Sequence, residues 1–407
     1  MATARAQGGS MDFRDTPDEA AFRKEVRDWL DHNLEPGFTN AQAAVGGERL
    51  KQLTDWQAKL HAGGWAGVSW PKEYGGRGAS LIEQAIFYQE MARAKVPNPI
   101  NVIGLGMAGP TIIAHGTEQQ KQRYLSKILS AEEIWCQGFS EPGAGSDLGG
   151  LRSSAVEDGD SYVINGQKVW TSLAHLAQQR GHCIFLARTD PSAPKHQGIT
   201  YFLVDMTSPG IEVRPLRQIT GHAEFNEMFF TDVRVPKENI LGAVNDGWRV
   251  AMTTLLHERG TLGFALSVAS RIALDELIAL ARTVKRDGKP AIEDASVRQR
   301  IAQLHIDIEA LRLNNYRALS STMKNGVPGP EGSFSKLIWS ESLQRLTELA
   351  IELLGPAGLQ GIDAKDPAVA RWSFAHLRSR GATIEAGTSE ILRNIIAERV
   401  LGLPKHK

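Results

Sequence analysis

Two glutamates flank a glycine near the C-terminal end of the sequence, where carboxylates and small residues together could do chemistry. Residues 382–393 read ATIEAGTSEILR, in which Gly387 and Thr388 separate Glu385 from Glu390. A helix that begins with small residues suits a phosphate group, because its free N–H groups and positive dipole end attract anions. A carboxylate beside such a helix start suits proton transfer. The segment therefore predicts a reaction site and leaves open which carboxylate serves it.

A third carboxylate lies on the apolar stripe of an expected helix in GWRVAMTTLLHERGTLGFA. Ala251, Leu255, Glu258, Leu262 and Ala265 follow the alternating four and three spacing of one helix face. A buried carboxylate raises its pKa or finds a partner, and a perturbed carboxyl that faces a pocket is a candidate general base. The plainer alternative is an ion pair between Glu258 and an arginine at a helix surface.

Two segments in the middle of the chain could bind a flat, polar ligand. FSEPGAGSD, residues 139–147, predicts a turn whose N–H groups and whose Ser140 and Ser146 hydroxyls could face such a ligand. KVWTS places Trp170 and Ser172 two residues apart on one expected strand, and hence on one face. Trp170 could wall a planar ring while Ser172 hydrogen-bonds its edge. Taken singly, the two segments also fit a plain turn and β-core packing.

The elements that must position these residues fall into three regions. Apolar residues at helical spacing, beginning with Phe22, Val26, Trp29 and Leu30, predict a first helical region. SYVINGQKVWTS and later β-rich runs predict a middle β-domain, with Asn165-Gly166 as a hairpin turn. Long helices return after residue 245, and in one of them Val297, Ile301, Leu304, Ile308 and Leu311 repeat as in a bundle. We predict an α+β fold with domains at residues 11–133, 134–243 and 244–407.

Composition excludes several classes of function. With 46 basic and 46 acidic side chains, the 407-residue chain has no electrostatic footprint for nucleic acid or an anionic membrane, so a small-molecule ligand is expected. Cys136 and Cys183 support neither a disulfide framework nor a metal site, which favours a reducing cytoplasm. MATARAQGGS at the start lacks the apolar region of a signal peptide, and no window is apolar enough to span a membrane.

GLGMAG, residues 104–109, matches the G-x-G-x-x-G fingerprint of dinucleotide-binding folds, but its context does not. No suitable strand precedes it, Pro110 follows at once, and no acidic residue lies about 20 positions on. We expect close helix packing at these glycines.

WCQGFSEPGAGSDLGGLRSSA, YVINGQKVWTSLAH and EAGTSEILRNIIAERVLGLP, in this order, resemble the acyl-CoA dehydrogenase family of flavoproteins. The similarity runs from about Phe13 to Pro404 and includes WPKEYGG and GTEQQKQRYL. It implies an N-terminal helical domain, a middle β-domain and a C-terminal four-helix bundle, with FAD between the last two and its tail meeting a neighbouring subunit.

The resemblance also implies roles for individual residues. The cofactor-binding residues that it implies are Gln137, Ser140, Gly145, Ser146, Trp170, Ser172, Thr388 and Glu390, with Arg282, Glu352 and Gly355 from a partner subunit. Ser146 also lines the CoA entrance, and Arg259 is expected near the substrate. The family commonly has a glutamine where Glu352 falls, and Pro356 interrupts its usual glycine pair, so the shared site departs from the family pattern.

The family's base removes the Cα proton of an acyl-CoA while a hydride leaves Cβ for the flavin. Many members carry that base directly before the Gly-Thr pair, where this sequence has Ala386. Glu385 is displaced by one residue and would point elsewhere. Isovaleryl-CoA and long-chain members carry the base on an earlier helix, immediately before an arginine, which matches Glu258-Arg259. We therefore expect Glu258 as the base, with the N–H of Ala386 still binding the thioester oxygen.

The expected function is FAD-dependent dehydrogenation of an acyl-CoA to the trans-2-enoyl-CoA, with electrons passed to an electron-transfer flavoprotein. The missing glutamate frees volume near the reacting carbons, so we expect a branched, bulky or long acyl group, a steroid side chain being one example. The expected assembly is a homodimer or homotetramer, with a mixed assembly as the alternative. Two other functions stay open, a non-catalytic FAD-binding subunit of a heteromeric dehydrogenase and a related flavin oxidase or monooxygenase.

Overall fold

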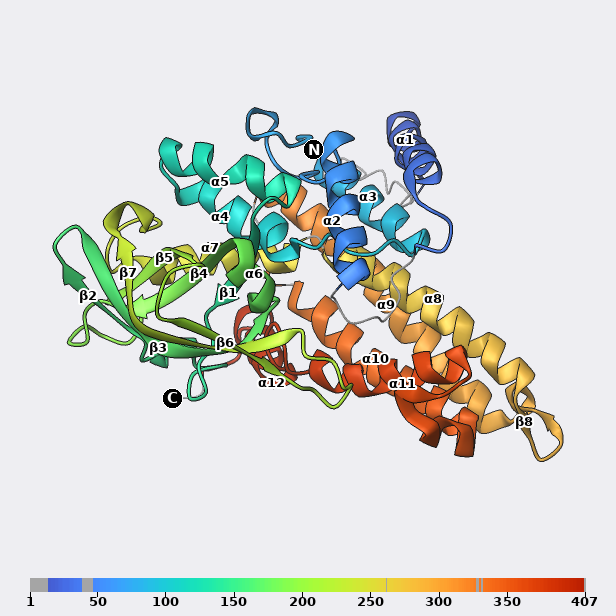
Figure 1. Ribbon diagram of the computed structural model, residues 1–407. Helices are drawn as coiled ribbons and strands as arrows, with labels where there is room; N and C mark the ends of the chain where they lie inside the picture. The colour runs from blue at the N-terminus through green and yellow to red at the C-terminus, as the bar shows by residue number, and fades with distance from the viewer. Residues whose placement is uncertain (1–13, 39–46, 261, 327–328, 331, 406–407) are drawn as a thin grey trace, which may run out of the picture.

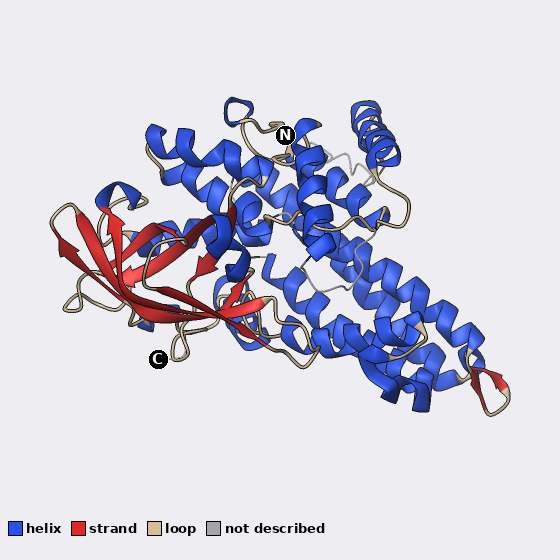
Figure 2. Cartoon of the chain, in the orientation of Figure 1, coloured by secondary structure: helices blue, strands red, loops and turns tan. Residues whose placement is uncertain are grey.

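The structure is a computed structural model that describes residues 14–38, 47–260, 262–326, 329–330 and 332–405. For residues 258–260 and 262 it describes the backbone alone. The segment MATARAQGGS lies outside the described residues. Helices and strands are segregated into a helical region, a β-sheet and a second helical region, as Figures 1 and 2 show, which confirms the predicted α+β fold. The domain boundaries stay predictions.

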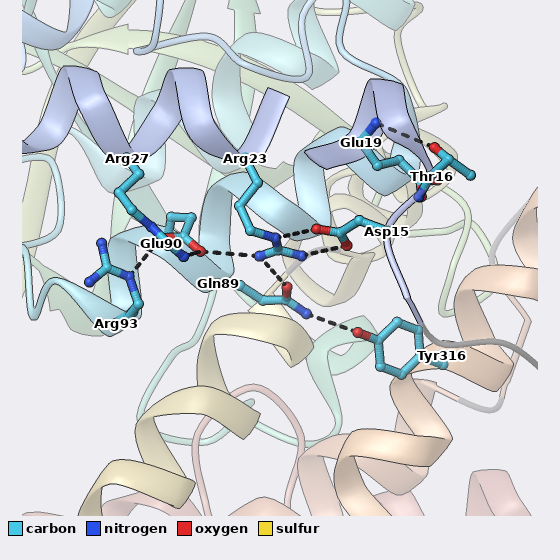
Figure 3. A network of polar contacts seen from close by, with 9 residues as sticks. All are labelled: Asp15, Thr16, Glu19, Arg23, Arg27, Gln89, Glu90, Arg93 and Tyr316. Atoms are coloured by element: carbon cyan, nitrogen blue, oxygen red, sulfur yellow. Dashed lines mark hydrogen bonds and ion pairs between the residues drawn. The ribbon is translucent and has the colours of Figure 1, made fainter. Parts of the chain in front are cut away.

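The first region is helical. They are α1 (Pro17–Asn33), α2 (Gly47–Ala62), α3 (Leu81–Arg93), α4 (Gly109–His115) and α5 (Glu118–Ser130). Thr16 caps α1 in a capping box with Glu19, which satisfies donors at the helix start. Phe22, Val26 and Leu30 are buried, which confirms the predicted stripe. Helix α1 is also tied to α3 by a network around Glu90, which Figure 3 shows.

The GLGMAG segment is helical, as predicted. Residues Gly104–Ala108 form a π-turn that leads directly into α4. A Cβ atom on Gly109 would lie 2.0 Å from the indole ring of Trp70. The glycine therefore permits close packing, and no phosphate-binding turn is formed here.

The middle region is a sheet with strand order β1-β4-β2-β3-β7-β6, and β5 pairs with β4. The strands are β1 (Ile134–Gly138), β2 (Ser154–Asp158), β3 (Ser161–Ser172), β4 (Gly181–Arg188), β5 (Ile199–Asp205), β6 (Ile211–Leu216) and β7 (Phe225–Pro236), with helix α6 (Ala174–Arg180) after β3. Ile184 and Leu186 of β4 join the apolar cluster under α4 and α5, whereas Cys183, Phe185 and Ala187 pack on the opposite face. Burial on both faces explains the almost unbroken apolar sequence of this strand.

The predicted hairpin at Asn165-Gly166 is wrong. Both residues lie inside β3, at a bulge where the register with β7 shifts. The Asn165 amide pairs with Asp232 on β7, and a Cβ on Gly166 would lie 2.2 Å from the Ser153 hydroxyl. Glycine is needed here for close approach, and the β2–β3 turn contains Gly159 at φ 64° instead.

The C-terminal region begins with two helices where the sequence predicts one continuous stripe. It contains α7 (Gly247–Gly260), α8 (Leu262–Thr283), the short strands β8 (Lys285–Arg286) and β9 (Lys289–Pro290), α9 (Ala295–Asn325), α10 (Gly332–Leu354), α11 (Pro367–Ala382) and α12 (Ser389–Ile395). The predicted bundle stripe from Val297 to Leu311 is confirmed, because its residues are buried, and those from Val297 to Ile308 form a cluster with α8 and α10. The stripe through Glu258 is divided, since Leu262 and Ala265 belong to α8.

No helix within the described ranges has both the length and the hydropathy needed to cross a bilayer.

Candidate functional site

The turn after β1 is closed by two backbone hydrogen bonds. The N–H of Glu141 donates to the carbonyl of Ala144 at 3.1 Å, and the N–H of Ala144 donates back to the carbonyl of Glu141 at 3.0 Å. Beyond this turn Gly145 and Ser146 are exposed, and a Cβ on Gly145 would meet no atom within 4 Å. These two predicted residues therefore border open space.

Trp170 lies at a second bulge of β3, where the register with β7 shifts between Lys168 and Thr171. Its φ of 61° is left-handed, an unusual conformation for a bulky residue, and its side chain is 61% exposed. The regular alternation from which we predicted a shared face for Trp170 and Ser172 does not hold across this bulge. Thr171 is buried and Ser172 is half-buried, so the bulge turns the indole of Trp170 out of the sheet.

The bulge is joined directly to the turn after β1. The N–H of Val169 donates to the carbonyl of Ser140 at 2.9 Å rather than to β7. Ser140 and Gln137 are both half-buried at this end of β1. The structure thus brings together the two middle segments that the sequence singled out.

A buried ion pair that the sequence analysis missed reinforces this junction. Lys168 Nζ lies 2.8 Å from Glu141 Oε1 and donates to the carbonyl of Phe139 at 3.2 Å. The Glu141 carboxylate also accepts the N–H groups of Arg152 and Ser153, at 2.7 and 2.9 Å. Burial raises the pKa of Glu141, but the charge and hydrogen bond of Lys168 outweigh it and leave that pKa below its ordinary value. Burial also lowers the pKa of Lys168, against the attraction of Glu141.

Residues 383–388, within this segment, form a strained turn between α11 and α12. Ala386 has a φ of 53° and Gly387 a φ of 97°, and Lys336 donates to the carbonyl of Gly387 at 2.7 Å. Thr388 caps α12 by accepting the N–H of Ile391 at 3.2 Å. Ala386 is exposed, and its N–H makes no hydrogen bond within the described part of the chain. A main-chain donor is therefore available beside the turn.

Neither glutamate of this segment has the environment of a general base. Glu385 accepts a hydrogen bond from Arg378 at 2.7 Å in an ion pair. Glu390 is exposed, and hydrogen bonds to its own N–H and to Thr388 hold its pKa below the ordinary value. A base that works near neutral pH needs the opposite shift.

Side chains of α11, which precedes the strained turn, contact side chains of the sheet. The guanidinium of Arg378 lies 5.8 Å from the centre of the Phe225 ring, which meets the Trp170 ring edge-on at 6.5 Å. The His222 ring, before β7, lies 4.7 Å from the Phe374 ring of α11 and is tilted by 51° to it, and Figure 1 shows α12 beside β6. A pocket here is lined by Thr383, Ile384, Thr388, Ser389 and Glu390, together with Glu341, Gln344 and Arg393. The segments that hold Ser140 and Trp170 on the sheet are therefore connected to the turn that holds Ala386 and Thr388.

Helix α7, which carries Glu258, is fixed by buried hydroxyl groups. Thr254 is fully buried, and its Oγ1 lies 3.0 Å from Oγ1 of Thr111 and 3.1 Å from the Tyr201 hydroxyl. Glu258 follows Thr254 by four residues, which is about one helical turn. The side chains of Glu258 and Arg259 lie outside what the structure describes.

Three of the predicted cofactor residues lie elsewhere. Glu352 is paired with Arg300 and with Arg286 at 3.6 Å, where α10 ends. Arg282 is exposed in the last turn of α8, and Gly355 follows α10 with a φ of 55°. This end of the bundle adjoins β8, which Figure 1 shows far from the sheet. Within one chain these residues do not meet the rest of the site.

The junction at the sheet fits the FAD that the resemblance implies. Trp170 and Ile384 leave large apolar side chains exposed, at 61% and 66%, where a flat ring system could cover them. Gly145 leaves an open approach, and the start of α12 suits a polar or anionic group.

Comparisons with known proteins cover almost the whole chain. The N-terminal, middle and C-terminal domains of acyl-CoA dehydrogenases match residues 16–132, 136–233 and 245–401. Acyl-CoA dehydrogenase IpdE1 of Mycobacterium tuberculosis is 43% identical over 394 residues, covering 95% of this chain and 98% of the relative.

Two solved structures are also similar. A steroid ACAD described as Tcur3481-Tcur3483 has a TM-score of 0.84 and 32% identity, covering 97% of this chain and 100% of that one. The ChsE4-ChsE5 complex from Mycobacterium tuberculosis has a TM-score of 0.82 and 32% identity, with the same coverage. This chain belongs to the acyl-CoA dehydrogenase family and is an FAD-dependent oxidoreductase that acts on CH–CH groups.

Proposed function

We propose that the protein converts a bulky acyl-CoA, such as one with a steroid side chain, to its trans-2-enoyl-CoA and passes the electrons to an electron-transfer flavoprotein. Two findings support a bulky substrate. One structural relative is described as a steroid ACAD, at 32% identity. Ala386 also stands where many family members carry a glutamate, and a methyl group leaves more room beside the reacting carbons.

Glu258 is the base in this proposal. The observation that carries it is that Glu385 is paired with Arg378, while position 386 has no carboxyl group. Removal of the Cα proton still requires a placed base, whose contribution is about 10² to 10⁴-fold in rate. Glu258 continues the helix that Thr254 anchors in the core, and Arg259 beside it is assigned to the substrate.

Substrate and cofactor are held by the remaining residues. The N–H of Ala386 donates to the thioester oxygen, where negative charge grows as the proton leaves. Ser146 lines the CoA entrance. Bound FAD supplies the hydride acceptor, and its contacts are Gln137, Ser140, Gly145, Ser146, Trp170, Ser172, Thr388 and Glu390. Arg282, Glu352 and Gly355 reach the cofactor of a partner subunit, because Arg282 is in the last turn of α8 and Glu352 pairs with Arg286 of β8, which lies far from the sheet (Figure 1).

Anaerobic mixing of the FAD-loaded protein with acyl-CoAs tests the substrate. The panel should contain straight, branched and steroid side-chain thioesters, and flavin absorbance should be followed after mixing. We expect fast bleaching with the bulky thioesters, and slow reoxidation by air but fast reoxidation by an electron-transfer flavoprotein. Bleaching by straight chains alone would contradict the substrate proposal, and fast reoxidation by air would indicate an oxidase or monooxygenase.

A second candidate is a subunit of a heteromeric dehydrogenase, which works only with an unlike chain. It is favoured by the ChsE4-ChsE5 relative, whose structure is described as a complex of two named proteins. In that case no acyl-CoA would bleach the isolated protein, and bleaching would appear when a second chain is added. Light scattering of the isolated protein separates a homo-oligomer from a subunit that needs its partner.

A further inference from the structure

Lys168 is an unusual residue for the centre of a sheet. Its side chain is fully buried, and it lies on β3 opposite Met228 of β7. Isolated buried ammonium groups are strongly disfavoured, so such a lysine persists only where partners compensate its charge. Here the partners are the Glu141 carboxylate, the Phe139 carbonyl and the face of the Phe185 ring, 4.7 Å from Nζ.

The pair joins two segments that are far apart in sequence. Lys168 and Glu141 are 27 residues apart, and each is next to a backbone group of the junction between β1 and β3. Ser140, which precedes Glu141, accepts the N–H of Val169, which follows Lys168. The turn after β1 and the bulge of β3 are thus joined by two interactions in adjacent positions, the Lys168–Glu141 ion pair and the hydrogen bond from Val169 to Ser140.

These two interactions hold a strained backbone conformation. Trp170 follows Lys168 by two residues and keeps a left-handed φ of 61°. Strained backbone of this kind persists only where its surroundings impose it, and it is concentrated at ligand sites. The Glu141 carboxylate also accepts the N–H of Arg152 at Oε2 and the N–H of Ser153 at Oε1. The same carboxylate therefore fixes the far end of the 141–153 loop.

We propose that Glu141 and Lys168 are positioning residues for FAD, which set the turn at Ser140 and turn the Trp170 indole outward before the cofactor arrives. The inference rests on the cofactor contacts proposed above for Ser140 and Trp170. Pre-organised groups lower the cost of binding, because their order is established in the free protein.

The variants Lys168→Met, Glu141→Gln and the double variant test this role. Lys168→Met keeps an unbranched side chain, one atom shorter, and removes its charge, and the double variant leaves no unpaired charge in the core. Glu90→Gln is the matched control, because Glu90 is a carboxylate of similar burial that pairs with arginines in the N-terminal helices. The readouts are the FAD Kd of the apoprotein from flavin fluorescence, the visible circular dichroism of bound flavin and the melting temperature.

We expect all three junction variants to raise the FAD Kd by about tenfold or more and to change the flavin dichroism, because the order of the Ser140 turn and of Trp170 would then have to be established as the cofactor binds. The double variant should recover melting temperature without recovering FAD affinity. Glu90→Gln should lower the melting temperature with its FAD Kd unchanged.

Junction variants that melt earlier but keep the wild-type FAD Kd and dichroism would overturn the inference. So would a double variant that recovers both stability and FAD affinity, since the pair would then only balance charge. Because FAD binding needs no acyl-CoA, failure of the substrate proposal would leave these readings unaffected.

Discussion

Glu90 is a buried carboxylate held by three arginines, and its replacement by glutamine should destabilise the packing of α1 on α3 (Figure 3). Oε1 accepts from Arg23 at 3.1 Å and from Arg27 at 3.0 Å, and Oε2 accepts from Arg27 at 3.0 Å and from Arg93 at 2.6 Å. Gln89, beside it, extends the network to Tyr316 on α9. The glutamine variant keeps the shape and removes the charge.

The pKa of Glu90 gives the size of the effect. Burial raises this pKa, but the hydrogen bonds from the three arginines outweigh burial and lower the pKa from 4.5 to about 2. A difference of about 2.5 pKa units, at 1.36 kcal/mol each, sets an upper limit of about 3 kcal/mol. Arg27 and Arg93 are 46% and 45% exposed, so water screens part of this energy. We expect a loss of about 2 kcal/mol at pH 7.

The dependence on pH separates this charge effect from a packing defect. Because the folded pKa is lowered, the stabilisation is fully present above pH 4.5 and is lost as the pH falls toward about 2. Urea unfolding at pH 7, 5 and 3 should therefore show a stability difference between wild type and Glu90→Gln that is constant at the two higher values and smaller at pH 3. Asp28→Asn is the control, since the exposed Lys24–Asp28 pair should contribute less than about 1 kcal/mol.

A difference that is equally large at pH 3 would refute the reasoning, because the lost energy would then not come from the ionised carboxylate. Equal stability of wild type and variant at pH 7 would refute it as well.

Two further substitutions test the packing that positions the site. Gly109→Ala should lower stability by about 1–3 kcal/mol, because its Cβ would lie 2.0 Å from the Trp70 ring, and an unchanged melting temperature would contradict this packing. Thr254→Val should cost about 1–3 kcal/mol by leaving the buried Thr111 and Tyr201 hydroxyls short of a partner. Since Thr254 anchors the helix that carries the proposed base, kcat should fall while the FAD content of the folded protein stays the same, and an unchanged kcat would separate this anchor from catalysis.

Periodicity was sufficient to predict α1 and α9, because each of these helices buries a single stripe. Phe22, Val26 and Leu30 in α1 and Val297 to Leu311 in α9 are buried as their spacing predicts. The break between α7 and α8 was not predictable in this way, since the apolar spacing from Ala251 to Ala265 continues across it.

The sheet was predicted less well, because its irregular features depend on contacts between distant residues. Asn165-Gly166 has the composition of a hairpin turn, but the close approach of Ser153 and the pairing with Asp232 place it inside β3. The bulge at Trp170 likewise follows from its partner strand.

The site itself could be outlined from motifs but not assembled. The Lys168–Glu141 pair was missed, although a lysine inside a β-rich run is a usable signal that a buried counter-charge exists elsewhere. Arg282, Glu352 and Gly355 were predicted to reach the cofactor of a partner subunit, and within one chain they lie apart from the other cofactor residues, so their role stays a prediction.

The central claim is that proton removal is performed from α7 rather than from the turn before α12. Anaerobic stopped-flow bleaching of the flavin by a bulky acyl-CoA tests it most directly, with Glu258→Gln and Glu385→Gln compared after each is shown to hold its full content of FAD. We expect the flavin of Glu258→Gln to bleach more slowly by about 10² to 10⁴-fold, whereas the flavin of Glu385→Gln should bleach at nearly the wild-type rate. If Glu385→Gln lost flavin bleaching while Glu258→Gln kept it, the claim that the base lies on α7 would be contradicted.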